Sequence, residues 1–219
     1  SHLTAAIIAE NIGIPYIKHE TVKWILDKTL FYNKFKEYHL KIPETRLISS
    51  EAELVQNLRE DKIYYLKSDF SKNPNYIYKV TSENFQDLNI FWGRDRYLRT
   101  CYVLQEEFIG EHLRLNLIGE HLYIYPLNDD YEVNTDAQNL REMGLINKLQ
   151  MLCKDSGLDK WVVKFDVVVS SNSYVLLDIG IDPPMRMKKS CERFGFPFYR
   201  EYINLVLNEK HKVFPNEKF

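Results

Sequence analysis

The stretch WVVKFDVVVSSNSYVLLDIGIDPPMR, residues 161–186, decides how this chain of 219 residues is interpreted. Two apolar runs rich in β-branched residues flank the polar residues 170–173, and this pattern predicts a β-hairpin. Asp166 and Asp178 lie inside the two runs, and Asp182 follows the second run. A buried strand carboxylate needs a partner, and several carboxylates held close together need a cation.

Two interpretations of these carboxylates are open. In one, a lysine such as Lys164 forms a salt bridge with one of them. In the other they bind Mg²⁺, which prefers oxygen ligands and takes one or two carboxylates with phosphate oxygens and water. Opposed residues of an antiparallel pair share a face, so an odd loop of three or five residues would bring Asp166 and Asp178 together. A shared metal therefore predicts an odd loop, with Asn172 as a candidate for the left-handed region.

The composition limits the class of protein. The length allows one large domain or two small lobes, each with a core. The formal charge is −2, from 29 basic and 31 acidic residues, and gives no support for a nucleic-acid or membrane partner. Three cysteines without CxxC spacing, Cys101, Cys153 and Cys191, indicate reduced thiols of a cytoplasmic protein. The sequence has no run of membrane length and no signal-peptide pattern, and its start looks like a cut into a longer protein.

Other elements follow from apolar spacing and capping residues. Helices are predicted at 3–12, at 20–39 with a break near 27–28, and at 139–153. Strands are predicted at 63–68, 76–80 and 102–108. Ser50 and Glu53 form a capping box for a further helix. A hairpin turning at 119–120 places leucines on one face and Arg114, Asn116 and Tyr125 on the other, where a solvated surface is the simplest expectation.

The order of these pieces resembles the ATP-grasp superfamily over essentially the whole chain, and is most similar to its carboxylate–amine ligases. An Asp-Lys helix, an Ile-Pro extension, a capped helix and a lysine strand precede a Gln-Glu-Glu strand, an arginine hairpin and the Asp…Asp hairpin. The resemblance implies an α+β fold of two lobes with ATP between antiparallel sheets. It implies N-terminal helices and a linker at 1–45, a small lobe at 46–100 and a large lobe at 101–219, without the family's N-terminal lobe.

The resemblance also implies which residues bind Mg²⁺ and ATP. Lys67 and Lys28 would contact phosphate oxygens, since an ammonium is a charge-assisted donor. Asp166, Asp178 and Asp182 would bind Mg²⁺. Recognition of adenine and ribose is assigned to four consecutive residues, Gln105, Glu106, Glu107 and Phe108.

Two arginines are the catalytic candidates. Arg114 would hold the γ-phosphate or an acyl phosphate, and Arg186 would stabilise transition-state charge or bind the carboxylate substrate. Three features depart from the family pattern, the first being Asp178, where the family usually has glutamate. The loop after Lys67 contains no glycine, although backbone amides wrap phosphates most closely where glycine is present. Gly180 stands where the family usually has asparagine, and Asp182 is the candidate to supply the missing oxygen.

The expected activity is that of an ATP- and Mg²⁺-dependent ligase. It would activate a small-molecule or peptide carboxylate as an acyl phosphate for attack by an amine. A small-molecule kinase on the same fold is one alternative. A nucleotide-binding regulatory or interaction domain without turnover is the other, because a fold does not fix a function.

Overall fold

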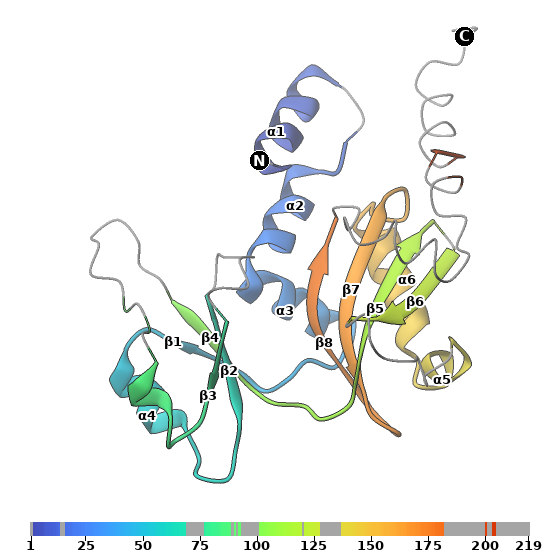
Figure 1. Cartoon of the computed structure of the whole chain (residues 1–219). Coiled ribbons are helices and arrows are strands. Elements are labelled where there is room, and N and C mark those ends of the chain that lie inside the picture. The colour runs from blue at the N-terminus through green and yellow to red at the C-terminus, as the bar shows by residue number, and fades with distance from the viewer. Residues whose placement is uncertain are drawn as a thin grey trace, which may run out of the picture.

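The fold is built from two four-stranded antiparallel sheets, seen on either side of the computed structural model in Figure 1. The structure describes residues 2–13, 16–68, 77–88, 90, 92, 101–119, 121–127, 137–181, 200 and 203–204. The expected α+β class with antiparallel sheets is confirmed. No helix in the described ranges has the length and apolar character needed to cross a membrane.

Most predicted elements are present. The described helices are α1 (His2–Ile12), α2 (His19–Leu26), α3 (Lys28–Glu37), α4 (Glu51–Asn57), α5 (Ala137–Glu142) and α6 (Leu145–Asp155), with a 3-10 turn at Phe85–Asp87. The first sheet, in the order β1-β4-β2-β3, contains β1 (Thr45–Ile48), β2 (Tyr64–Ser68), β3 (Ile77–Val80) and β4 (Tyr102–Glu106). The second, in the order β6-β5-β7-β8, contains β5 (Glu111–Ile118), β6 (His121–Pro126), β7 (Val162–Val169) and β8 (Tyr174–Gly180).

One face of the first sheet packs on α4 around a small hydrophobic core. Leu54 of α4 is fully buried there together with Leu66 of β2. The Ser50 hydroxyl accepts a hydrogen bond from the Glu53 backbone N–H at 3.2 Å, as the capping box predicts. The Glu53 carboxylate accepts a hydrogen bond of 2.7 Å from the backbone N–H of Ser49, which is one residue earlier than the capping box predicts.

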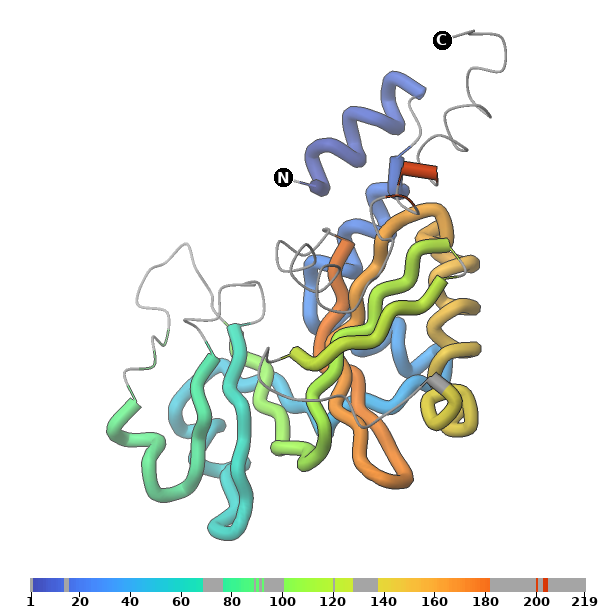
Figure 2. Tube along the Cα trace, turned by 45° about the vertical axis from the view of Figure 1, so that its right-hand side comes forward, coloured from blue at the N-terminus to red at the C-terminus, as the bar shows by residue number. Residues whose placement is uncertain are grey.

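The larger core lies on one face of the second sheet. Leucines from alternate positions of β5 pack there against Phe165 of β7, and α6 contributes Leu149 and Leu152. Figure 2 shows α6 behind strands β5 and β7. Helix α3 covers the same face, because the rings of Phe35 and Phe165 lie 6.4 Å apart. Since helices cover this face, the other face of the sheet carries the polar residues.

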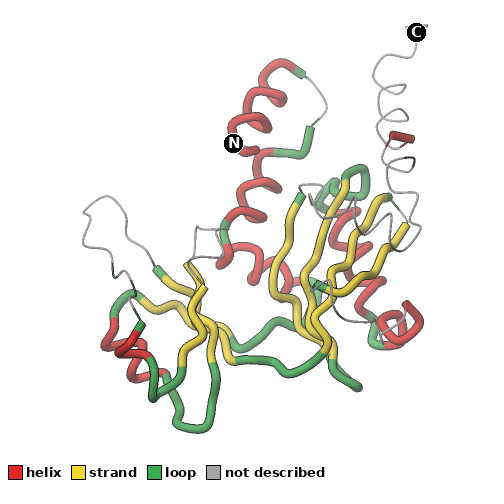
Figure 3. Tube along the Cα trace, in the orientation of Figure 1, coloured by secondary structure: helices red, strands yellow, loops and turns green. Residues whose placement is uncertain are grey.

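Two loops join the sheets, at residues 38–44 and 107–110, as Figure 3 shows. The first loop is fixed to β8 by a hydrogen bond of 2.8 Å from the Leu176 N–H to the Lys41 carbonyl. The second passes so close to β7 that a Cβ on Gly110 would lie 2.3 Å from the Val169 carbonyl oxygen. Both loops therefore pass beside the β7–β8 hairpin near its turn end.

Two elements differ from the predictions. Strand β1, which pairs with β4 at the edge of the first sheet, was not predicted. Strand β4 thus belongs to the first sheet, although the predicted boundary at residue 101 grouped it with the large lobe. The helix predicted over residues 139–153 is instead two helices, because Gly144 adopts a left-handed φ of 71° between α5 and α6.

The pairing register of the β7–β8 hairpin differs from the prediction, although Asp166 and Asp178 still lie opposite each other. Val169 pairs with Tyr174, so the loop is even, with residues 170–173 between them. An even loop alone would separate the two aspartates, and the predicted odd loop is wrong. The register shifts between Asp166 and Val167, which leaves Leu177 as an extra residue in β8 and places Asp178 opposite Asp166. A β-bulge therefore brings the carboxylates to one face.

The bulge also decides which leucine enters the core. Leu176 pairs with Val167 and is fully buried, whereas Leu177 is the bulged residue and is only partly buried. We expect Leu176→Ala to lower the free energy of unfolding by about 2–5 kcal/mol and Leu177→Ala by less than half as much. Urea denaturation of the two variants measures this difference. The reverse order would indicate the bulge-free register with an odd loop.

Candidate active site

Two rows of residues cross the open face of the second sheet. The aspartate row consists of Tyr125, Arg114, Asp166 and Asp178, which are successive cross-strand partners. The glycine row lies two residues away along each strand on the same face, and it consists of Tyr123, Asn116, Lys164 and Gly180. This face was expected to be a solvated surface. That expectation is wrong for Asn116, Tyr123 and Tyr125, which are all buried.

Arg114 and Asp166 form a two-point ion pair in the aspartate row. Nε donates to Oδ1 at 2.6 Å and Nη2 donates to Oδ2 at 2.8 Å. Both side chains are only 15% exposed, so solvent screens the pair weakly. A carboxylate offers about four lone-pair positions, and Arg114 uses two of them. Asp166 can therefore still act as a ligand while Arg114 fixes its orientation.

Asn116 has an unpaired acceptor on the same face. Its Nδ2 donates to the Tyr125 hydroxyl at 2.6 Å, which fixes the orientation of the amide. Its Oδ1 is buried and accepts no hydrogen bond within the described part of the chain. A buried oxygen without a donor is unfavourable, so a cation or a donor from a ligand would stabilise it.

Lys67 and Gln105 occupy the facing surface of the first sheet. Lys67 Nζ donates to Gln105 Oε1 at 2.8 Å, and Gln105 Nε2 donates to the Thr45 hydroxyl at 3.1 Å. Burial lowers the pKa of Lys67 to about 8, while the charges of Asp178 and Asp166 act to raise it. The two sheets therefore place this lysine and the aspartate row within electrostatic range of each other.

Helix α3 brings two further side chains to this region. Asp27 caps the helix by accepting a hydrogen bond from the Leu30 N–H at 3.0 Å, so the predicted break at 27–28 is confirmed. Lys28, in the first turn, is only 9% exposed, although the positive end of a helix dipole disfavours a cation. Tyr32 donates to the carbonyl of the bulge residue Leu177 at 2.9 Å. Burial first, and then the charge of Asp178, raises the pKa of Tyr32.

The predicted adenine and ribose residues are divided between the faces of the first sheet. Glu107 accepts hydrogen bonds from the Tyr65 hydroxyl at 2.9 Å and from Lys79 at 3.4 Å. Glu106 instead pairs with Lys62 at 2.7 Å. Phe108 is partly buried in the loop that joins the sheets. Their assignment to nucleotide recognition, with Gln105, stays a prediction.

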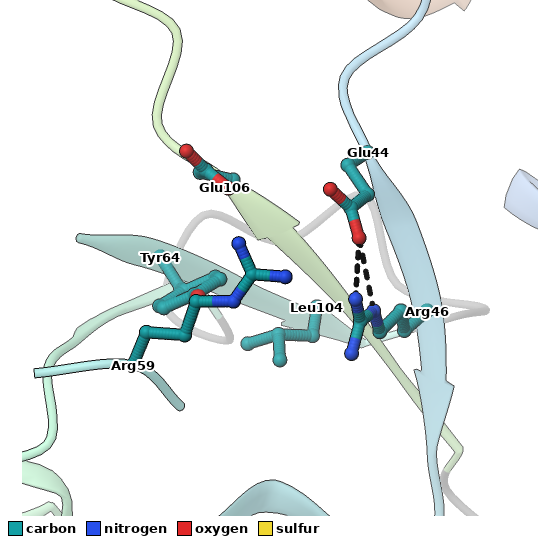
Figure 4. Close-up of a pocket in the computed structure, with 6 residues that line it drawn as sticks. All are labelled: Glu44, Arg46, Arg59, Tyr64, Leu104 and Glu106. Atoms are coloured by element: carbon teal, nitrogen blue, oxygen red, sulfur yellow. Dashed lines mark hydrogen bonds and ion pairs between the residues drawn. The ribbon is translucent and has the colours of Figure 1, made fainter. Parts of the chain in front are cut away.

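A hollow on the opposite face of the first sheet lies outside this arrangement. Figure 4 shows its lining residues, with Arg46 joined to Glu44. The full lining is Glu44, Arg46, Arg59, Tyr64, Leu104 and Glu106. Tyr64 and Leu104 alternate along their strands with Tyr65 and Gln105, so they point away from Lys67. The hollow is therefore separate from the facing rows.

Two predicted residues, Asp182 and Arg186, lie outside the described residues. The predicted group of three carboxylates is thus represented by Asp166 and Asp178, and no group of three or more His, Cys, Asp or Glu that could hold a metal occurs in the described ranges. Tyr32 and Asn116 were missed as site residues. Asn116 alternates with the leucines of β5 in the sequence, but nothing local indicated that Tyr32 contacts the bulge.

Comparisons with known proteins give structural matches only. No family model matches the chain, and no curated protein sequence matches it. The crystal structure of D-alanine–D-alanine ligase from Bacillus anthracis, complexed with ATP, matches with a TM-score of 0.70 and 17% identity. The match covers 99% of this chain and 76% of that one.

Two further structures support the same fold. A RimK domain ATP-grasp protein from Sphaerobacter thermophilus matches with a TM-score of 0.70 and 17% identity, over 94% of this chain and 76% of that one. D-Alanine–D-alanine ligase from Helicobacter pylori matches with a TM-score of 0.67 and 17% identity, over 92% and 64%. The ATP-grasp fold expected from the sequence is therefore confirmed.

The Tyr32 hydroxyl generates a prediction about stability. Tyr32→Phe leaves the partly buried Leu177 carbonyl without this donor and should lower the free energy of unfolding by about 1–3 kcal/mol. Tyr38→Phe is the matched control, since its hydroxyl bonds the exposed Asp155 at 3.0 Å and its loss should have a smaller effect. Urea denaturation compares the two. Equal effects would remove Tyr32 as the residue that supports the bulge.

Lys67 generates a prediction about pH. Its folded pKa of about 8 lies below the ordinary 10.5, so between these values the unfolded chain binds more protons and stability rises with pH. Below pH 8 the folded protein carries the full penalty of a buried ammonium. Lys67→Met should therefore be more stable than the parent near pH 7, and the difference should shrink as the pH approaches 10.5. Denaturation at several pH values measures it, and a difference independent of pH would contradict this account.

Proposed function

We propose that this chain, which has the ATP-grasp fold, is an ATP-dependent ligase that joins a carboxylate to an amine. The observation that carries the proposal is the pairing of surfaces across the two sheets. Lys67, with a lowered pKa, faces the aspartate row, in which Arg114 fixes Asp166 beside Asp178. Such a surface offers cations for phosphate oxygens and carboxylates for a metal ion.

Two lysines are proposed to bind the phosphates of ATP. Lys67 and Lys28 are both largely removed from solvent, and each lowers its energy when an anion approaches. Lys28 lies at the first turn of α3, where backbone N–H groups also favour an anion. Phosphate binding would therefore stabilise the Lys67 ammonium, whose charged form burial disfavours.

The oxygen atoms on the open face of the second sheet are suitable ligands for Mg²⁺. Asp166 and Asp178 are directly opposed carboxylates, and Asn116 adds a buried Oδ1 without a donor. All three are hard oxygen ligands of the kind that Mg²⁺ takes together with phosphate oxygens and water. When bound, Mg²⁺ neutralises charge on the phosphates during transfer.

The proposed reaction has two steps and balances without a covalent protein intermediate. An oxygen of the substrate carboxylate attacks the γ-phosphorus of ATP, which forms an acyl phosphate and releases ADP. The amine then attacks the acyl carbon, the bond from that carbon to the phosphate oxygen breaks, and inorganic phosphate leaves, with the amine proton passing to phosphate or solvent. Arg114 is proposed to stabilise the transferred group, and positioning together with charge neutralisation would supply the catalysis. Small molecules or peptides are the proposed substrates, and the cytoplasm is the proposed location.

A second candidate is a nucleotide-binding regulatory domain without turnover. Two observations favour it. Arg114 is already engaged by Asp166 through both carboxylate oxygens, and the loop after Lys67 has no glycine. Product analysis with ATP, Mg²⁺ and a panel of carboxylates and amines separates the candidates. An amide with ADP and phosphate supports the ligase, a phosphorylated product indicates a kinase, and nucleotide binding without product indicates the regulatory domain.

Asp178 provides the mutational test of this function. Asp178→Asn keeps the shape of the side chain and removes the charge that binds the metal, so turnover should fall by at least about 100-fold while nucleotide binding is largely kept. The exposed Asp87, mutated to asparagine, is the matched control and should leave both unchanged. Steady-state rates and calorimetric titration with ADP measure the two effects. Full activity of Asp178→Asn would refute the role of the aspartate row.

A further inference from the structure

The stem of Lys164 occupies the space above Gly180 in the glycine row. A Cβ added to Gly180 would lie 2.2 Å from Cε of Lys164, and 3.1 and 3.2 Å from its Cγ and Cδ. Real Cβ atoms do not approach carbon this closely, so residue 180 can carry no side chain while Lys164 follows this path. The glycine row therefore contributes a lysine that extends across β8 and no ligand oxygen from the side chain of residue 180.

The Lys164 ammonium lies on the face that carries both aspartates. Asp166 is two residues further along β7, and Asp178 is two residues before Gly180 on β8. Residues two apart on one face of a strand are separated by about 7 Å, and long side chains reach diagonal neighbours at this spacing. Lys164 thus adds a positive charge beside the aspartate row.

Protein cations outnumber carboxylates in the arrangement described above. Two of the cations are Lys67 of the first sheet and Lys28 of α3. The other two, Arg114 and Lys164, belong to the second sheet, as do the two carboxylates Asp166 and Asp178. One of the two carboxylates is shared with Arg114. A first divalent ion can take both carboxylates as ligands. A second would find fewer ligands and the charge of Lys164 nearby, which repels it.

We propose that the Lys164 ammonium takes the electrostatic place of a second divalent cation, so that this chain binds ATP together with one divalent ion. The inference rests on the proposed function, because it requires ATP at this site. Lys164 donates to phosphate oxygens and supplies a fixed positive charge that needs no ligands of its own. Gly180 is then the residue that makes room for it.

A simpler role for Lys164 would be to neutralise Asp178 as part of the fold. The two roles differ in what they predict for ligand binding. A structural lysine would affect the free energy of unfolding and would leave the affinity for a nucleotide triphosphate and the number of bound metal ions unchanged. A phosphate-binding lysine changes the affinity directly.

The number of bound ions is tested first, on the unmodified chain. Mn²⁺ is titrated in the presence of the non-hydrolysable analogue AMP-PNP, and electron paramagnetic resonance counts the ions bound in the complex. One Mn²⁺ per complex is expected. Two would overturn this inference alone and would return Asp182 as a candidate ligand for the second ion. Failure to bind AMP-PNP would instead refute the proposed function and this inference with it.

Variants then test the pair of residues. Lys164→Ala should weaken AMP-PNP binding by about 10- to 100-fold, as expected for losing a hydrogen bond to a charged group. Gly180→Ala should have a similar effect, because the new Cβ displaces the lysine stem. The double variant should be no weaker than Lys164→Ala within about twofold, since only one interaction is lost. The exposed Lys154, mutated to alanine, is the control with parental affinity.

Two results would overturn the role of Lys164 even if the ion count is one. The first is parental affinity of Lys164→Ala for AMP-PNP. The second is full additivity of the two single effects, because Gly180 would then act independently of the lysine. Thermal melting of each variant in the absence of ligand confirms that the measured affinities come from folded protein.

Discussion

The bulge at Leu177 is the constraint on which the site depends. The hairpin between β7 and β8 has an even loop, which by itself would turn Asp178 to the core face beside Phe165. The extra residue restores the register so that Asp178 lies opposite Asp166. Tyr32 supports it by a hydrogen bond of 2.9 Å to the Leu177 carbonyl. Helix α3 therefore supports the aspartate row through the Tyr32 hydroxyl and adds no carboxylate to that row.

The same helix joins the two halves of the site. Lys28 begins α3 and Tyr32 lies one turn later, so a single rigid element positions a buried cation and fixes the strand that carries Asp178. On the first sheet, Lys67 is held by Gln105 and has a lowered pKa because it is buried. The buried Lys67 ammonium is at a disadvantage until an anion binds, and this is the physical basis for proposing a polyphosphate ligand.

The order of the elements and several site residues could be predicted from the sequence. The strand register and the burial that bring these residues together could not. Asp166 and Asp178 were identified because carboxylates are unusual inside apolar strands, and Lys67 was identified through the resemblance to the ATP-grasp superfamily. The bulge was not predicted, since the alternation in β8 is compatible with two registers and only the packing of Leu176 into the core selects one. The burial of Asn116 was missed for the same reason. Burial is set by packing in three dimensions, and a strand sequence fixes only which residues share a face.

A crystal structure with Mn²⁺ and AMP-PNP tests the central claim most directly, because anomalous scattering locates the metal independently of the nucleotide. We expect the triphosphate to lie between Lys67 and the aspartate row and the Mn²⁺ peak to lie within bonding distance of Asp166 and Asp178. The contrary result would be a nucleotide in the hollow lined by Arg46 and Arg59, behind the first sheet, or a metal peak remote from both aspartates. Either would show that the facing rows are a structural ion network rather than the place where ATP binds.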